Sequence, residues 1–158
     1  MKKLHIFADS LFAHEMLHLC SGIAMFFLLW KMFGQIKYGV LGFLVSLLID
    51  IDHYLEGLIA NRLNFSWIFK TYPNEYWRKT GVITLLFHSW ELLLIVFLIG
   101  IISNHRLLAL SIVYPAALHY LIDNLIYTSF RGMSVLQYFL VFRVINGFSY
   151  EKLCRAKS

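Results

Sequence analysis

Charged residues are scarce in this sequence. Asp, Glu, Lys and Arg make up 15% of its 158 residues and hydrophobic residues 59%, whereas a typical soluble domain is about 25% charged. A soluble globular protein is therefore not expected. Proline occurs only 2 times, and neither a low-complexity tract nor an internal repeat is evident, so residues 1–158 are expected to form one domain. The 2 cysteines, Cys20 and Cys154, are too few for a disulfide framework and are interpreted as free thiols.

Long apolar runs indicate a membrane protein. A helix needs about 20 apolar residues to cross the hydrocarbon of a bilayer, and four stretches reach that length: Ser10 to Phe33, Tyr38 to Ile59, Val82 to Ile102 and Leu107 to Tyr127. The first is interpreted as a retained span, because Glu15 interrupts it and no cleavage site follows. The apolar segment 135–148 is shorter and contains Arg143. We therefore expect an all-α integral membrane protein, a four-transmembrane-helix bundle with a short interfacial C-terminal helix.

The distribution of Lys and Arg predicts the orientation. Three of the 14 lie in the connections after the first and third spans, and the other eleven lie in the N-terminus, the middle connection and the C-terminal tail. The positive-inside rule then places both termini in the cytoplasm. The same bias accounts for the net charge of +5 without a nucleic-acid partner, and the expected partners are membrane lipids.

Ionisable residues inside apolar spans are rare and usually functional. Every span here contains some: His14, Glu15 and His18; Asp50, Asp52, His53 and Glu56; His88 and Glu91; His119 and Asp123. With both termini on one side, all four sets fall at a similar depth, in the cytoplasmic half. Pairs three or four residues apart share one helical face, and each span has one: His14 with His18, Asp50 with His53, His88 with Glu91, and His119 with Asp123. Asp52 does not fit so simply, because two residues turn a regular helix by about 200°; it could support a ligand, bind a second ion or mark a break in the helix.

Such a set requires something that offsets its cost. A central Asp costs about 2.5–3.5 kcal/mol in a span, so three Asp and Glu91 together approach ~10 kcal/mol, the stability of a whole domain. A bound divalent metal can offset this, since structural zinc binds with ~10–16 kcal/mol. Mixed imidazole and carboxylate ligands favour zinc, with Mn²⁺ or Fe²⁺ as alternatives, and the candidates suffice for one or two ions.

The motifs resemble a known family. The run Leu48-Ile49-Asp50-Ile51-Asp52-His53, the pair His88-Ser89 and the run from His119 to Asp123 before Gly132 are similar to the YdjM-like (LexA-regulated) family of membrane-bound metal-dependent hydrolases. Phe87 stands where the family has Thr, and Glu91 is an additional acid. The resemblance implies hydrolysis of a lipid or other ester in a bacterial or archaeal cytoplasmic membrane.

The hydrolase interpretation assigns roles to specific residues. Asp52 or Glu91 would act as the general base, and Arg78, Lys79 or Arg131 would hold an anionic head group at the cytoplasmic boundary. The expected metal ligands are His18, Asp50, His53, His88, His119 and Asp123. A metal held there would lower the pKa of a bound water and polarise a phosphoryl or carbonyl oxygen.

Two other function classes are open. The run His14-Glu15-Met16-Leu17-His18 is a literal H-E-x-x-H, the zinc-protease motif in which the two His bind zinc and the Glu activates water. On a span, it is similar to intramembrane site-2-type proteases, in which a later Asp completes the zinc shell. The third class is a non-enzymatic metal-binding or ion-transport protein, although the outer halves of the spans are almost wholly apolar.

Substitution of Glu15 separates the two enzymatic interpretations. Glu15→Gln would abolish activity in a protease, because the motif has no other group to activate water. In the hydrolase interpretation, the same variant loses activity only in part. The measurement is hydrolysis of membrane peptides and of lipid esters by the purified variant and the wild type.

Overall fold

The computed structural model of the chain describes residues 11–60, 73–131 and 133–154. Within these ranges the chain forms helices, and its extended pairing is one isolated bridge. The all-α prediction is therefore confirmed. In chain order the elements are α2 (Leu11–Phe33), α3 (Ile36–Leu48), α4 (Ile51–Ala60), α5 (Pro73–Thr80), α6 (Trp90–Ile102), α7 (Arg106–Arg131), η2 (Val135–Tyr138), α8 (Leu140–Ile145) and α9 (Tyr150–Cys154).

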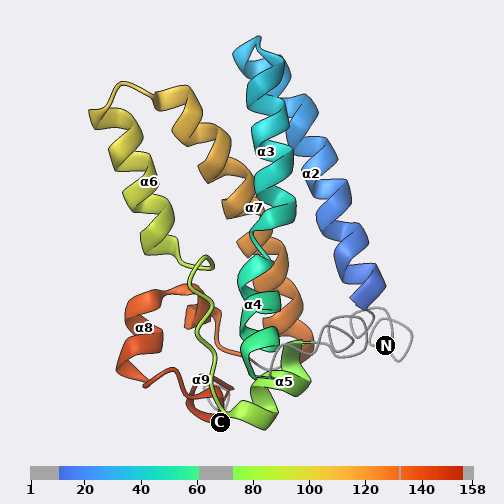
Figure 1. Cartoon of the computed structure of the whole chain (residues 1–158), viewed down its shortest axis with the longest axis vertical. Helices are drawn as coiled ribbons and strands as arrows, with labels where there is room; N and C mark the ends of the chain where they lie inside the picture. Colours follow the sequence, from blue (N-terminus) through green and yellow to red (C-terminus); the bar gives the residue numbers. More distant parts are fainter. Residues whose placement is uncertain (1–10, 61–72, 132, 155–158) are drawn as a thin grey trace.

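Helices α2 and α3 form a long antiparallel hairpin (Figure 1). The turn passes through Gly34, whose φ of 69° lies in the left-handed region that glycine adopts without steric penalty. Small residues of α3 are buried in the contact: Gly39, Gly42 and Ser46. A Cβ atom at Gly39 would lie 2.5 Å from the backbone carbonyl oxygen of Phe26. The two helices approach closely because α3 has no side chain at this point, as is common between helices in lipid.

Helix α7 is the centre of the bundle. It forms a second hairpin with α6 and also packs against α3 and α2 (Figure 1). The contact with α6 is again made by small residues, because a Cβ atom at Gly100 would lie 2.1 Å from the Cβ of Ala109. Helix α7 therefore contacts all three of the other long helices of the bundle.

Within the described residues, three helical stretches are long and apolar enough to cross a membrane: His14–Phe33, Ile36–Leu58 and Arg106–Ile126. They indicate membrane association. The remaining expected span, 82–102, differs, because its helix α6 begins at Trp90 and has 13 residues. At 1.5 Å per residue, α6 is about 20 Å long, against about 30 Å of hydrocarbon. A bundle of four full spans is therefore not confirmed.

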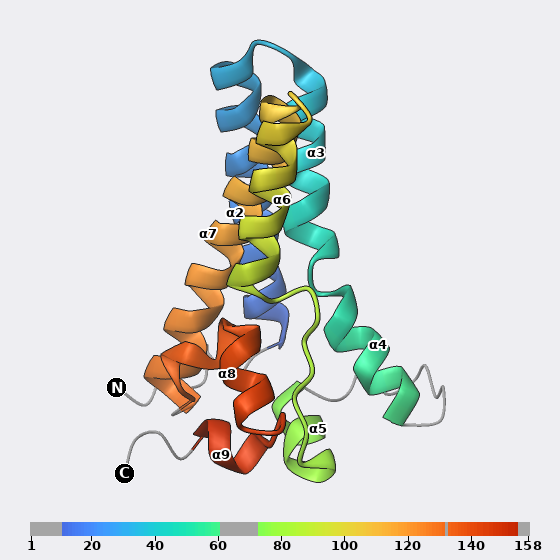
Figure 2. The ribbon, with the colours of Figure 1, turned by 90° about the vertical axis from the view of Figure 1, so that its left-hand side faces the viewer.

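The second span is interrupted near its middle. Helix α3 ends at Leu48 and α4 begins at Ile51, and α4 turns away from the line of α3 (Figure 2). The regular-helix argument that separated Asp50 from Asp52 does not apply across this break. Both aspartates are buried, each with 5% exposure.

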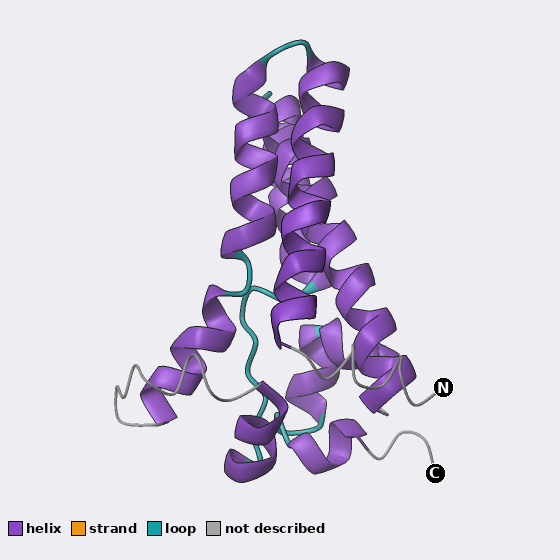
Figure 3. Cartoon of the chain, turned by 90° about the vertical axis from the view of Figure 1, so that its right-hand side faces the viewer, coloured by secondary structure: helices purple, strands orange, loops and turns teal. Residues whose placement is uncertain are grey.

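The segment expected to form one interfacial helix, 135–148, is two short elements, η2 and α8, followed by a turn. With α9, they lie at the same end of the molecule as α5 and the start of α2 (Figure 1), and the narrow bundle widens there (Figure 3). An antiparallel bridge joins Val82 to Ser149, and the Ile83 amide donates to the Phe148 carbonyl at 2.9 Å. The C-terminal segment is therefore fastened to the chain that precedes α6.

Gly39→Ala is expected to lower the free energy of unfolding by about 1–3 kcal/mol, the usual cost of overpacking a tight contact. The reason is that the new methyl group would meet the Phe26 carbonyl oxygen. The measurement is thermal unfolding of the purified protein in detergent, with Val40→Ala as the control, since Val40 is exposed on the same helix. Equal melting temperatures for the two variants would contradict a close contact between α2 and α3.

Candidate metal centre

Eight histidine and aspartate side chains converge at the wider end of the bundle. Each is at most 8% exposed, although all eight are polar or charged. Their ligand atoms form three overlapping groups, each compact enough to hold a metal ion. The residues are His14 and His18 of α2, Asp50 at the break, Asp52 and His53 of α4, His88 before α6, and His119 and Asp123 of α7.

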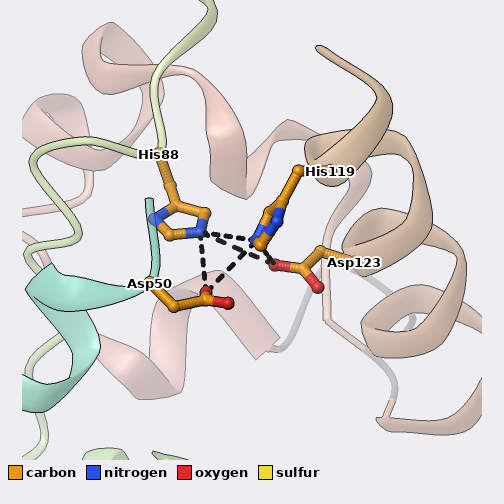
Figure 4. Close-up of side chains that lie close together, drawn as sticks. All are labelled: Asp50, His88, His119 and Asp123. Atoms are coloured by element: carbon orange, nitrogen blue, oxygen red, sulfur yellow. Dashed lines mark hydrogen bonds and ion pairs between the residues drawn. The ribbon is translucent and has the colours of Figure 1, made fainter. Parts of the chain in front are cut away.

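The central group consists of Asp50, His88, His119 and Asp123 (Figure 4). The Nε2 atom of His119 lies 3.2 Å from an oxygen of Asp50 and 3.5 Å from Asp123 Oδ2. The Nε2 atom of His88 lies 3.3 Å and 3.7 Å from the same two oxygens, and the two Nε2 atoms are 3.4 Å apart. Ligand atoms about 2.1 Å from a zinc ion lie about 3.4 Å from one another in a tetrahedron. The separations in this group match the edges of such a site.

The second group adds the two histidines of α2. The Nε2 atoms of His14 and His18 are 3.1 Å apart, and they lie 3.6 Å and 3.0 Å from Asp123 Oδ1. Asp123 therefore presents Oδ1 to this group and Oδ2 to the central group. Its Oδ2 also accepts a hydrogen bond from the Tyr138 hydroxyl at 3.1 Å. A carboxylate that faces two ligand groups in this way is suited to bridge two ions.

The third group explains the position of Asp52. Its Oδ2 lies 3.1 Å from Nδ1 of His88 and accepts the Phe87 amide at 2.9 Å. If Nδ1 donates to Asp52, Nε2 of His88 keeps its lone pair for a metal, the usual carboxylate–histidine–metal arrangement. Among the described residues, Nδ1 of His18, His53 and His119 has no hydrogen-bond partner. His53 instead directs its Nε2 toward Asp50, at 3.5 Å.

His88 is carried by irregular backbone rather than by a helix. The segment 82–89 precedes α6, and its peptide groups are bonded by side chains from other elements. Glu56 of α4 accepts the amides of Thr84 and Leu85 at 2.8 Å and 2.7 Å. The hydroxyl of Tyr120 donates to the Phe87 carbonyl and accepts a hydrogen bond from the amide of Ser89. Side chains therefore supply the partners that a helix would otherwise provide within itself.

Arg143 of α8 is fully buried and donates hydrogen bonds to carbonyl groups of the segment 82–89. Its guanidinium donates to the carbonyls of Thr84 and Leu85 at 2.7 Å and 2.6 Å, and to the carbonyl of His88 at 2.9 Å. Burial lowers the pKa of Arg143, while the negative charges of Asp52 and of nearby glutamates raise it. The C-terminal segment thus fixes the position of His88 without contributing a ligand.

Two acidic residues named from the sequence have other contacts. Glu91 accepts the amides of Leu140 and Val141, at 2.9 Å and 3.1 Å, and caps the start of α8. The expected pairing of Glu91 with His88 depended on a shared helix, but His88 lies before α6 begins. Glu15 accepts a hydrogen bond from Tyr54 at 2.8 Å and belongs to none of the three groups.

The cations expected to bind a head group belong to none of the three ligand groups. Arg78 and Lys79 are exposed in the last turn of α5. Arg131 is the last residue of α7, and its side chain lies outside the described part of the structure.

Sequence reasoning gave no role to four residues that organise the site: Glu56, Tyr120, Tyr138 and Arg143. Glu56 was recognisable as an ionisable residue in an apolar stretch. Arg143 was noted only as a charge that argued against another span. Their bonding partners lie far away in sequence, so a local pattern carries no signal of the contact.

A scan of the sequence against models of known protein families finds no match, and searches of curated proteins and of solved structures find no significant similarity. The resemblance to the YdjM-like family therefore stays a hypothesis that rests on the motifs themselves.

Arg143→Lys is expected to lower the free energy of unfolding by about 2–4 kcal/mol, because each hydrogen bond from a charged group contributes about 1.5–3 kcal/mol and lysine cannot reach three carbonyls at once. Thermal unfolding in detergent measures the effect, and Arg78→Lys, an exposed change of the same kind, is the control. An Arg143→Lys protein that melts with the wild type would show that the carbonyls of segment 82–89 do not depend on the guanidinium.

Proposed function

We propose that this protein is a membrane-embedded, metal-dependent hydrolase that acts on a lipid or another membrane-associated ester or phosphoester. The observation that carries the proposal is Asp123, which presents one oxygen to each of two buried ligand groups. Sites with two metal ions are typical of enzymes that hydrolyse esters and phosphoesters. The position of both groups among apolar helices favours a substrate that comes from the membrane.

The charge of the cluster supports two divalent cations. Asp50, Asp52 and Asp123 carry three formal negative charges, and each is at least nine-tenths buried. Burying a carboxylate costs several kcal/mol unless a positive charge compensates it. The imidazoles compensate that charge only when they are protonated, whereas two divalent ions would compensate it with the imidazoles neutral. Imidazole nitrogen with carboxylate oxygen favours zinc, and Mn²⁺ or Fe²⁺ are the alternatives.

The proposal assigns different roles to the metal ions and to the acidic residues. Divalent ions at such a site supply Lewis-acid chemistry and acidify a water molecule. Asp52 holds His88 through Oδ2, and its Oδ1 is buried without a hydrogen-bond partner among the described residues. That oxygen is available to accept a proton, so Asp52 remains the candidate general base. Glu91 is not proposed for this role because its carboxylate is bonded to α8.

The alternative of an intramembrane metalloprotease has one specific observation in its favour. His14, His18 and Asp123 form a compact group, which is the ligand set that the H-E-x-x-H interpretation requires. It leaves Asp50, His88 and the rest of the central group without a role. The hydrolase proposal accounts for both groups. It also accounts for a cluster that is confined to one end of the bundle, whereas an ion pathway would need polar groups that continue to the other end.

The metal content of the purified protein tests the site. Elemental mass spectrometry is expected to find two transition-metal ions per wild-type chain. The double variant His14→Ala/His18→Ala is expected to keep about one, because the central group keeps its four ligands. Asp123→Ala is expected to lose both, because each group loses a ligand.

His105→Ala is the matched control, since His105 is exposed in the turn between α6 and α7, and this turn lies at the end of α6 and α7 opposite to the cluster (Figure 1). It should retain both ions, and circular dichroism verifies the fold of every variant. Loaded wild-type protein should hydrolyse members of a phospholipid and ester panel, and Asp123→Ala should not. Wild-type protein that folds without metal, or that binds two ions and hydrolyses none of the panel, would contradict the proposal.

A further inference from the structure

An apolar groove runs along the bundle between α3 and α6. Both helices pack on α7, which lies behind them in Figure 1 and lines the groove with Ile112, Ala116 and Tyr120. The groove has a volume of about 350 Å³ and opens to the outside. Aliphatic side chains line it almost throughout, among them Val45, Val96 and Ile112.

One end of the groove meets the metal-binding cluster. Ile49, Phe87 and Tyr120 line this end, and each is the immediate chain neighbour of a ligand of the central group. Tyr120 belongs to both features, because its ring also lies 5.4 Å from that of His88, measured between centroids. The groove therefore ends beside the proposed catalytic groups.

The other end has a different character. Leu41 lines the groove and also a second cavity, of about 260 Å³, that contains Lys37 and His105. From Leu41 to Ile49 the helix rises about 12 Å, which is close to half of the roughly 30 Å hydrocarbon core. The apolar section thus has the depth of one leaflet.

We infer that this groove holds one acyl chain of a membrane lipid, with the tail toward Leu41 and the head-group end at the metal-binding cluster. The inference rests on the proposed hydrolase function and identifies the substrate class as an acyl lipid. An extended peptide is a poor occupant, because its backbone needs hydrogen-bond partners in an apolar surrounding and the groove offers aliphatic side chains. Because tails gain little by leaving other tails, selectivity comes from the head group at the cluster and from the shape of the groove.

A photoreactive lipid tests this site. The wild-type protein is reconstituted in vesicles of phosphatidylethanolamine and phosphatidylglycerol that contain a phosphatidylglycerol with a diazirine midway along one chain. After irradiation, peptide mass spectrometry locates the label. Label at Val45, Val96 and Ile112 is expected to exceed label at Ile95 and Leu98, which are exposed on α6 outside the groove.

Filling the groove should remove this excess. Val45→Trp is expected to reduce labelling of the groove about tenfold, equivalent to about 1.4 kcal/mol. Val40→Trp is the matched control, since it makes the same change at an exposed position of the same helix and should label as the wild type. Val96→Trp with Ile95→Trp as its control repeats the comparison on α6 in case Val45→Trp does not fold.

The outcomes test the acyl site and the hydrolase function separately. Even labelling of groove and outer surface, or cross-links between two chains across the groove, overturns the acyl site. The metal content of the same samples is measured alongside. Groove labelling in metal-free protein would support the acyl site and contradict the hydrolase, whereas even labelling in protein with two ions would contradict the acyl site alone.

Discussion

The interaction on which the rest of the structure depends is the compensation of three buried aspartates. Asp50, Asp52 and Asp123 lie among apolar helices, where an uncompensated carboxylate costs several kcal/mol. Each lies within 3.5 Å of at least one imidazole nitrogen, and those imidazoles come from α2, from the segment 82–89 and from α7. The segments that carry these groups must therefore meet at one end, which constrains the packing of α2, α4 and α7 together.

A second constraint follows from the first, because two ligands lie on irregular backbone. Asp50 sits at the break between α3 and α4, and His88 in the segment before α6. In an apolar surrounding such backbone persists only if its peptide groups find other partners. Glu56 bonds amides of the segment, and Arg143 bonds its carbonyls. The C-terminal helices are thus part of the site, although they contribute no ligand.

The regular parts of the site could be predicted from the sequence. His14 with His18, and His119 with Asp123, lie on continuous helices, where a spacing of four residues places them on one face. The pairing of His88 with Glu91 was wrong. Segment 82–89 has the apolar composition of a membrane helix, but its backbone is irregular, because side chains distant in sequence bond its peptide groups. Arg143 is 59 residues from Thr84, whose carbonyl it binds. Such contacts leave no signal in the local pattern of apolar residues. For the same reason, the apolar stretch from Val82 to Ile102 predicted a longer helix than α6, which begins at Trp90.

Helix α7 shows why a metal site and an acyl groove would occur together. His119 and Asp123 are four residues apart on the face toward the cluster, and Ile112, Ala116 and Tyr120 follow the same spacing on the face toward the groove. Because one residue turns a helix by about 100°, these two faces adjoin each other where His119 and Tyr120 are neighbours in the chain. A lipid with its chain along one face would bring the bonds beside its head group to the other within a single helical turn. In this proposal, Tyr120 is the side chain of α7 that lies between the groove and the metal-binding cluster, because it lines the groove and its ring lies beside that of His88.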